Sequence, residues 1–209
     1  MKTVFEKIAE MPLAAVLRGV SPEEVVGVCE ELEGAGFRFV EVTTNSPDWQ
    51  DSLRRIRQKF GARLVLAGGT VLTVQQAEQA AEAGAEVLIS PNFDPDVVRR
   101  TKELGLVSAP GCFTPSECFD ALKAGADILK IFPAEVLGLP FIKGMKAVLP
   151  KETRLCPTGG VTPGNLADFL RLGVFALGMG SALYAPGKER AAIRASAEKF
   201  VSAYRQRPH

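Results

Sequence analysis

The stretch Asp127-Ile128-Leu129-Lys130-Ile131-Phe132-Pro133 places one charged side chain inside a short apolar run. A glycine precedes the run and a proline ends it, which predicts a buried β-strand. Successive side chains of a strand point to opposite faces, so Lys130 shares its face with Ile128 and Phe132. If helices cover both faces, as in parallel sheets, the Lys130 ammonium points into the interior. Two interpretations follow: a lysine that reaches water from a strand end, or a lysine buried for its chemistry.

The same unit repeats along the chain, with an amphipathic helix that ends at a glycine and an apolar strand that follows. We expect eight strands, at residues 13–17, 37–42, 63–67, 86–90, 106–109, 128–132, 154–157 and 174–177. This order predicts an α/β fold, a single (β/α)8 TIM barrel with a short N-terminal helix, as one domain over residues 1–209. An open doubly wound sheet is the main alternative, but residues 18–22, after the first strand, lack its glycine-rich loop.

Composition narrows the classes of partner. The formal net charge is +1 and the basic residues are scattered, which argues against a nucleic-acid partner. No apolar run approaches the roughly 20 residues that a membrane helix needs, and the N-terminus lacks the apolar core of a signal peptide, so we expect a cytoplasmic protein. The four cysteines form no C-x-x-C pair and His209 is the only histidine, so we expect no metal site and no cofactor.

In a barrel the chemistry lies at the carboxyl ends of the strands, and the unusual residues of this chain fall there. Glu41 repeats the pattern of Lys130, because it too is a charge inside an apolar strand. One interpretation is a buried ion pair that holds the barrel together, although such pairs stabilise weakly once desolvation is counted. The other is an amine nucleophile beside a carboxylate that moves protons.

Two glycine-containing segments follow the last two expected strands: Thr158-Gly159-Gly160 and Gly178-Met179-Gly180-Ser181. Backbone N–H groups of such turns can hold a phosphate, and the seventh and eighth loops are the usual phosphate site of a barrel. The alternative is that the glycines only form tight turns. Arg18, at the end of the first strand, can pair with a carboxylate or lie on the surface, and Thr70 can donate a hydrogen bond to the same carboxylate.

The sequence resembles the class I aldolases for 2-keto-3-deoxy-6-phosphogluconate and 2-keto-3-deoxy-6-phosphogalactonate, together with the related 4-hydroxy-2-oxoglutarate aldolase. The resemblance covers nearly the whole chain. It is carried by Ala15-Val16-Leu17-Arg18, Val40-Glu41-Val42-Thr43, Gly68-Gly69-Thr70-Val71, Ile89-Ser90-Pro91, Leu129-Lys130-Ile131-Phe132-Pro133-Ala134-Glu135 and Cys156-Pro157-Thr158-Gly159-Gly160-Val161. Most relatives show Gly-Ala-Gly-Thr where this chain has Ala67-Gly68-Gly69-Thr70, so the resemblance does not determine the fine shape of the carboxylate pocket.

The resemblance implies a role for each matching residue. Lys130 would form the Schiff base and Glu41 would be the general acid and base. Arg18 and Thr70 would hold the pyruvyl carboxylate. Pro91 and Phe132 would line the pocket, and Thr158 would face the substrate hydroxyls. The residues that would bind the phosphate are Gly159, Gly160, Gly180 and Ser181. The reaction implied is reversible cleavage of a phosphorylated 2-keto acid to pyruvate and D-glyceraldehyde 3-phosphate by a homotrimer, without metal or cofactor.

The substrate epimer follows less directly from the resemblance. Residues 45–49, 91–92 and 141–150 resemble the galactonate branch, whereas Thr158 resembles the gluconate branch, whose members carry threonine where galactonate members tend to carry valine. We expect the 6-phosphogalactonate substrate, with 6-phosphogluconate or 4-hydroxy-2-oxoglutarate as alternatives. Two more distant alternatives are an isomerase or sugar-phosphate synthase on the same barrel and a binding protein without catalysis.

Overall fold

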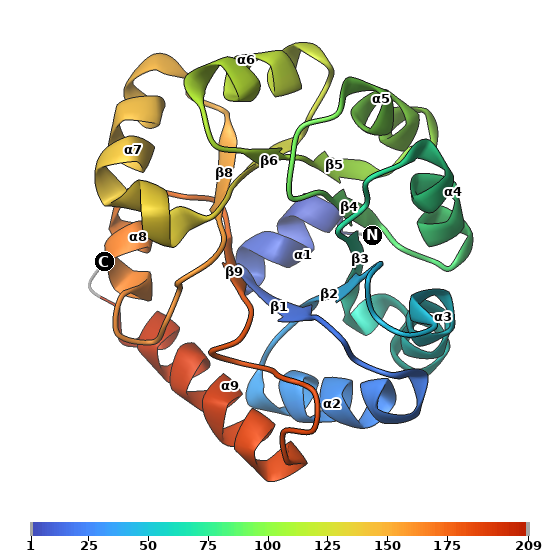
Figure 1. Cartoon of the computed structure of the whole chain (residues 1–209). Helices are drawn as coiled ribbons and strands as arrows, with labels where there is room; N and C mark the ends of the chain where they lie inside the picture. Colours follow the sequence, from blue (N-terminus) through green and yellow to red (C-terminus); the bar gives the residue numbers. More distant parts are fainter. Residues whose placement is uncertain (1, 208–209) are drawn as a thin grey trace.

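The computed structural model describes residues 2–207, so His209 lies outside the described residues. Its strands are β1 (Leu13–Leu17), β2 (Phe39–Thr43), β3 (Val65–Gly69), β4 (Val87–Ile89), β5 (Val107–Ala109), β6 (Gly111–Cys112), β7 (Ile128–Ile131), β8 (Arg154–Pro157) and β9 (Leu177–Met179). Its α-helices are α1 (Val4–Glu10), α2 (Pro22–Ala35), α3 (Trp49–Phe60), α4 (Val74–Glu82), α5 (Pro95–Glu103), α6 (Pro115–Lys123), α7 (Ala134–Val148), α8 (Leu166–Arg171) and α9 (Arg190–Arg205). The strands lie inside and α2–α9 outside them (Figure 1).

All strand pairs within the described residues are parallel, and they form two sheets. The larger has the order β5-β4-β3-β2-β1-β9 and the smaller has the order β6-β7-β8. An isolated parallel bridge between Thr158 and Gly178 connects the end of β8 to β9. The structure is therefore a parallel α/β fold whose six-stranded sheet curls around an interior (Figure 1).

The fifth expected strand, residues 106–109, corresponds to β5, and a further short strand, β6, follows it directly after Pro110. Proline has no N–H group, so the hydrogen-bond ladder is interrupted there. The chain still connects the two sheets at this place, because the Asp127 amide donates to the Ser108 carbonyl and the Lys130 amide donates to the Pro110 carbonyl, both at 3.0 Å. The prediction of a (β/α)8 barrel is thus met only in part, because the strands form two sheets, and this proline explains the interruption between β5 and β6.

Three strands begin two or more residues later than the apolar pattern predicts. β2 begins at Phe39 instead of residue 37, β3 at Val65 instead of residue 63, and β9 at Leu177 instead of residue 174. Before β2 the reason is the helix end, since Gly36 has a left-handed conformation and the Phe37 amide still donates to Leu32 of α2. Before β3, residues Gly61–Arg63 form a 3-10 turn.

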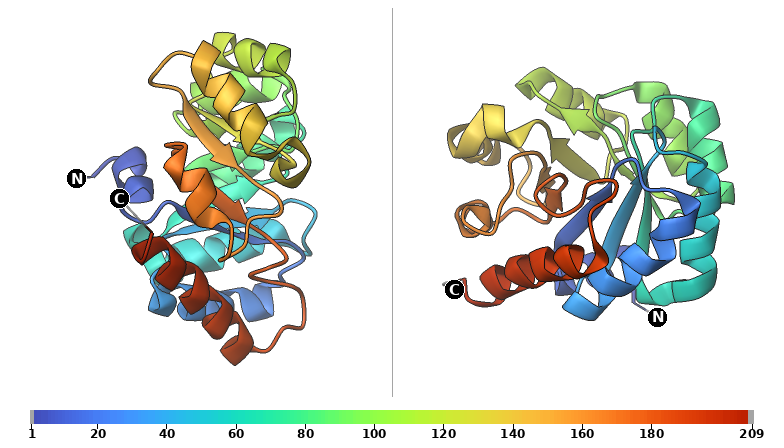
Figure 2. Two further views of the ribbon diagram at one scale, coloured as in Figure 1. Left: turned by 90° about the vertical axis from the view of Figure 1, so that its left-hand side faces the viewer. Right: turned by 60° about the horizontal axis from the view of Figure 1, so that its bottom comes forward.

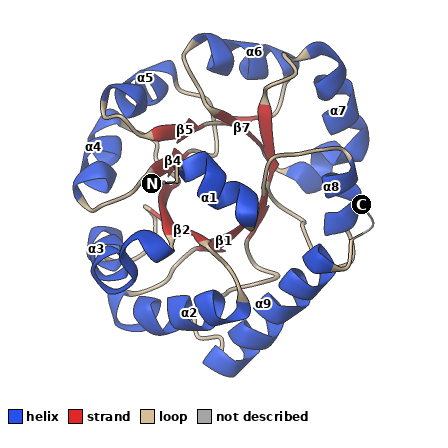
Figure 3. Ribbon diagram, turned by 180° about the vertical axis from the view of Figure 1, so that it is seen from behind, coloured by secondary structure: helices blue, strands red, loops and turns tan. Residues whose placement is uncertain are grey.

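The buried side chains form two clusters. The inner cluster lies among the strands and includes Ala14, Phe39, Val87 and Ile128. Helix α1 packs against it through Ile8 and covers one end of the strands (Figure 3). The larger outer cluster fills the space between the strands and the surrounding helices. The last helix, α9, lies beside α2 on the outside (Figure 2), so the first and last helices of the outer layer are neighbours.

No helix between residues 2 and 207 is both long enough and apolar enough to cross a membrane.

Candidate functional site

Lys130 lies in β7 with 4% of its surface exposed. Its neighbours across the sheet are Gly111 of β6 and Cys156 of β8. Its ammonium nitrogen lies 5.0 Å from the centre of the Phe132 ring, within the range of a cation–π contact. Lys130 lines both a small interior cavity and a larger open one, so the lysine side chain stands where the two cavities meet.

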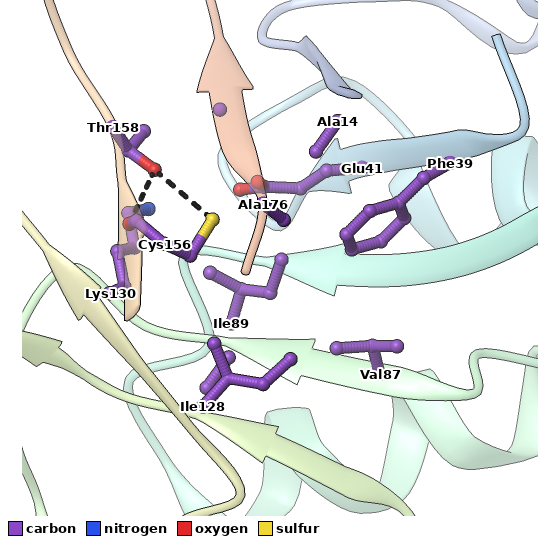
Figure 4. A pocket seen from close by; sticks show the side chains of 12 residues that line it. Ala14, Phe39, Glu41, Val87, Ile89, Ile128, Lys130, Cys156, Thr158 and Ala176 are labelled. Atoms are coloured by element: carbon purple, nitrogen blue, oxygen red, sulfur yellow. Dashed lines mark hydrogen bonds between the residues drawn. The ribbon is translucent and has the colours of Figure 1, made fainter. Parts of the chain in front are cut away.

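Glu41 lies in β2 with 2% of its surface exposed and lines the interior cavity. Figure 4 shows the Glu41 carboxylate extending toward the side where Lys130, Cys156 and Thr158 lie. Among the described residues Lys130 has no carboxylate oxygen within 4.0 Å, and Oε1 of Glu41 has no hydrogen-bond partner. Glu41 and Lys130 thus line one cavity but do not form the close ion pair that was one of the two interpretations of the sequence.

The open cavity has a volume of about 600 Å3. It contains most of the residues that the sequence singled out, namely Arg18, Lys130, Phe132, Thr158, Gly159, Gly160, Gly180 and Ser181. These residues come from strand ends far apart in the chain. Their convergence is the geometry expected for a site at the carboxyl ends of parallel strands.

Arg18 lies at the rim of this cavity. Its guanidinium donates to Oδ1 of Asn45 at 3.0 Å and to Oγ1 of Thr70 at 3.4 Å. Thr70 has φ of 56°, an unfavourable value for a residue other than glycine. The Thr44 hydroxyl donates to the Thr70 carbonyl at 2.6 Å and holds this conformation. Arg18 and Thr70 are thus brought together, as the sequence predicts, and Asn45 and Thr44 support them.

The glycine loop after β8 borders the same cavity. Gly159 and Gly160 have φ of 95° and 68°, and a β-carbon at Gly160 would lie 2.4 Å from Cβ of Glu135. Asn165 closes the loop: its Nδ2 donates to the Gly160 carbonyl at 2.8 Å, and its Oδ1 accepts from the Thr162 amide at 2.8 Å. The loop therefore has a fixed shape that only glycine allows at these positions.

Thr158 follows β8 and is 8% exposed. Its hydroxyl donates to the Cys156 carbonyl at 3.4 Å and lies 3.9 Å from the Cys156 sulfur (Figure 4). A β-carbon at Gly178 would lie 2.4 Å from Oγ1 of Thr158, so this hydroxyl packs directly against β9. Burial raises the pKa of the Cys156 thiol to about 11, with a smaller contribution from Glu41. Cys156 is therefore a neutral thiol at ordinary pH.

Pro91 lines neither cavity. Its carbonyl packs against β6, where a β-carbon at Gly111 would lie 2.2 Å from it.

Sequence reasoning missed three cavity or loop residues, Cys156, Asn165 and Tyr184. The Tyr184 hydroxyl donates to Glu24, and burial together with this hydrogen bond raises the pKa of Tyr184. The sequence carries a signal only for Cys156, through its alternation with Thr158 along one strand.

In the part of the chain that the structure describes, no group of three or more His, Cys, Asp or Glu side chains is placed to hold a metal ion.

The chain is similar to known proteins over most of its length. Residues 4–194 match the family model described as KDPG and KHG aldolase. The 2-dehydro-3-deoxy-6-phosphogalactonate aldolase of Escherichia coli (strain K12) is 41% identical over 199 residues, which cover 94% of this chain and 96% of that protein. A solved structure described as native KDPGal is 40% identical with a TM-score of 0.92 and covers 94% of this chain and 96% of its own. The 2-keto-3-deoxy-6-phosphogluconate aldolase of Zymomonas mobilis ZM4, solved with 3-phosphoglycerate, is 29% identical with a TM-score of 0.83, covering 94% and 92%.

Proposed function

Because the chain belongs to the KDPG and KHG aldolase family, we propose that it is a class I aldolase that cleaves 2-dehydro-3-deoxy-6-phosphogalactonate reversibly to pyruvate and D-glyceraldehyde 3-phosphate. The observation that carries the proposal is the position of Lys130. Its amine is buried, has no carboxylate within 4.0 Å among residues 2–207, and stands at the junction of the two cavities. A buried amine without an ion-pair partner is suited to nucleophilic catalysis.

The covalent step begins when the Lys130 nitrogen adds to the C2 carbonyl of the substrate. Loss of water from the resulting carbinolamine gives a protonated imine, which accepts the electron pair when the C3–C4 bond breaks. The proton of the C4 hydroxyl leaves, and the aldehyde product is released. Protonation of the enamine at C3 and addition of water to the imine then release pyruvate and free the lysine.

Glu41 is our candidate for the proton transfers. Its carboxylate lies in the interior cavity with Lys130, and its unpartnered Oε1 is available as an acceptor. The cavity volume of about 10 Å3 is at the lower limit of what one water molecule needs. This supports proton transfer between Glu41 and the substrate through one water, which general acid–base catalysis permits.

The two anionic ends of the substrate would be held on different sides of Lys130. Arg18 and Thr70 form a pair of donors suited to the C1 carboxylate. Gly159, Gly160, Gly180 and Ser181 line the other side of the open cavity and offer backbone N–H groups and a hydroxyl to the phosphate. The bound 3-phosphoglycerate of the Zymomonas mobilis relative supports a phosphorylated ligand for this family. Phe132 and Thr158 would form the walls of the cavity between the carboxylate and phosphate ends of the substrate. Pro91 would contribute only indirectly, through its contact with Gly111.

The galactonate substrate is favoured by the 41% identity with the Escherichia coli enzyme of that name. The alternative is the 6-phosphogluconate epimer, which Thr158 favours through its hydroxyl group, and 4-hydroxy-2-oxoglutarate is a further alternative by the same mechanism. The relative turnover of the two C4 epimers by the purified protein decides between the first two.

Three further proposals concern the architecture. If Val107–Ala109 and Gly111–Cys112 are counted as one strand interrupted at Pro110, the strands become the eight of a (β/α)8 barrel, because β8 and β9 are bridged at Thr158 and Gly178. We propose that residues 1–209 form this one domain. We also propose a homotrimer, which light scattering coupled to size-exclusion chromatography tests directly.

The nucleophile is tested by trapping the imine. The protein is incubated with pyruvate, reduced with borohydride, digested and examined by mass spectrometry, and the label is expected on the peptide that contains Lys130. Lys130→Met should lose the label and the cleavage activity while keeping its circular dichroism spectrum. Lys143→Met, in the exposed part of α7, is the matched control and should keep both.

A label that is absent from the Lys130 peptide would contradict the aldolase mechanism and favour an isomerase or a non-catalytic phosphate-binding protein. Unfolding of Lys130→Met, with labelling elsewhere in the wild type, would instead assign Lys130 a structural role.

A further inference from the structure

A second polar cavity lies at the opposite end of the strands from Lys130. Its volume is about 420 Å3, and its wall includes four cationic side chains, Lys146, Lys151, Arg154 and Arg207. We refer to it as the basic cavity. Arg154 begins β8, whereas Thr158, which lines the proposed aldolase site, follows the end of the same strand. Four residues of strand span about 13 Å, so the two sites are separate.

The four cations of the basic cavity are not neutralised by acidic side chains. No Asp or Glu lines this cavity. Within residues 2–207 none of the four makes an ion pair within 4.0 Å, although sixteen such pairs occur elsewhere in the described structure. Arg57 and Lys102, which also face neighbouring elements, do have carboxylate partners. The basic cavity thus brings four cations without such partners around one concave surface.

Helix ends account for part of this arrangement, because four helices, α1, α7, α8 and α9, end near the basic cavity. Lys146 donates to the carbonyl of Gly173 after α8 at 2.9 Å, and it lies in the last turn of α7. Arg207 follows the end of α9. The C-terminal end of a helix carries about half a negative charge, so four ends contribute about −2 against four positive charges. The helix ends thus offset about half of the charge, and an excess of about +2 remains.

The two guanidinium groups are held in place by aromatic rings. The Arg154 guanidinium lies 4.2 Å from the centre of the Phe5 ring and 5.6 Å from that of Phe175. The Arg207 guanidinium lies 3.7 Å from the centre of the Tyr204 ring and donates to the Tyr204 carbonyl and hydroxyl. Stacked guanidinium groups lose little freedom when they bind an anion, and their fork of donors matches phosphate oxygens.

We propose that the basic cavity binds a compact polyanion of the di- or triphosphate class. A remaining charge of about +2 suits a ligand that carries two to four negative charges. The volume lies in the range of small-molecule sites. The source of the phosphates is either inorganic pyrophosphate or the phosphate chain of a nucleoside triphosphate.

The proposal is tested by titration calorimetry of the full chain with inorganic pyrophosphate and, separately, with ATP. The test variant is Lys146→Glu combined with Lys151→Glu, which reverses two exposed charges of the basic cavity. The control is Lys143→Glu combined with Lys199→Glu, which changes the net charge equally at exposed positions outside this cavity. We expect the affinity to fall by about tenfold or more in the test variant and by less than about threefold in the control.

The two ligands separate the two sources. Equal affinity for pyrophosphate and ATP assigns recognition to the phosphates alone, and tighter binding of ATP assigns a contact to the base. Binding to neither anion at millimolar concentration, or equal weakening in both variants, overturns the proposal. An affinity that the test variant leaves unchanged also overturns it, because the anion would then occupy the glycine loops of the other site. Lys130→Met should bind the polyanion normally, so this test is independent of the aldolase assignment.

Discussion

A β-carbon at Gly69 would lie 2.0 Å from Oε1 of Glu41 and 2.6 Å from its carboxyl carbon. The carboxylate therefore occupies the space that any other side chain at position 69 would need. Both residues are buried in adjacent strands, β2 and β3, and the Thr44 amide donates to the Gly69 carbonyl at 2.7 Å. The absence of a side chain at Gly69 thus determines where the proposed acid–base group lies.

Replacing Gly69 by alanine should displace the Glu41 carboxylate without removing it. We expect kcat for aldol cleavage to fall by about 100-fold, because a misplacement of about 1 Å has an effect of that size. Imine formation with pyruvate, measured by borohydride trapping, should persist because Lys130 is untouched. Gly144→Ala is the control, since a β-carbon there meets nothing within 4 Å and should stabilise α7 slightly. An unchanged kcat in Gly69→Ala would show that Glu41 is not the group that moves the proton.

Thr158→Val tests how the enzyme distinguishes the C4 epimers. Valine keeps the shape that packs against Gly178 and removes only the hydroxyl. One hydrogen bond contributes about 1 kcal/mol, so the ratio of kcat/KM for the galactonate and gluconate substrates should shift about fivefold toward galactonate. Thr162→Val changes another threonine of the open cavity and should leave the ratio unchanged. Equal loss of activity toward both epimers would instead indicate that the hydroxyl acts on a part that the two substrates share.

Ser181→Ala tests the phosphate end of the site. We expect KM for the phosphorylated substrate to rise about five- to tenfold, since one hydrogen bond to a charged group is lost. Cleavage of 4-hydroxy-2-oxoglutarate, which has no phosphate, should keep its KM and thus serves as the internal control. A KM that rises for both substrates would place Ser181 near the keto-acid end of the cavity instead.

Cys156 makes the stability depend on alkaline pH. Its pKa is about 11 in the folded protein, because of burial, against 9.0 in the unfolded chain. Above pH 9 the unfolded state loses this proton while the folded state retains it, so folding stability falls as the pH rises from 9 to about 11. The loss from this thiol is about 2–3 kcal/mol. Urea unfolding at pH 8 and pH 10.5 should therefore show a smaller loss for Cys156→Ala than for the wild type. Identical losses would show that the thiol ionises freely in the folded protein.

Much of this arrangement can be predicted from sequence because it depends on local patterns. Lys130 and Glu41 stand out because each is a charge inside an apolar strand, and both are buried around one cavity. The glycines after β8 and β9 likewise mark loops that need unusual backbone angles or close approach, and the loops meet in the open cavity. Strand alternation and glycine positions can be interpreted from the sequence because residues that are neighbours along the chain produce both signals.

The features that sequence reasoning missed depend on contacts between distant residues. Thr70 has a left-handed conformation that no local pattern signals, and Thr44 and Arg18 stabilise it from other strands. Asn165 closes the glycine loop from the start of α8. The four cations of the basic cavity are spread from residue 146 to residue 207 and look scattered in the sequence. Pro110 could be read as a strand end, but its carbonyl still binds the amide of Lys130.

Strand β8 has Arg154 at its first position and leads directly into Thr158, so one short rigid segment reaches both cavities. Binding energies at the two ends of such a segment obey reciprocity. If a polyanion at Arg154 changes the affinity for the keto acid by some factor, the keto acid must change the affinity for the polyanion by that same factor. Calorimetry in either order of addition therefore measures one coupling free energy, and the two measurements check each other.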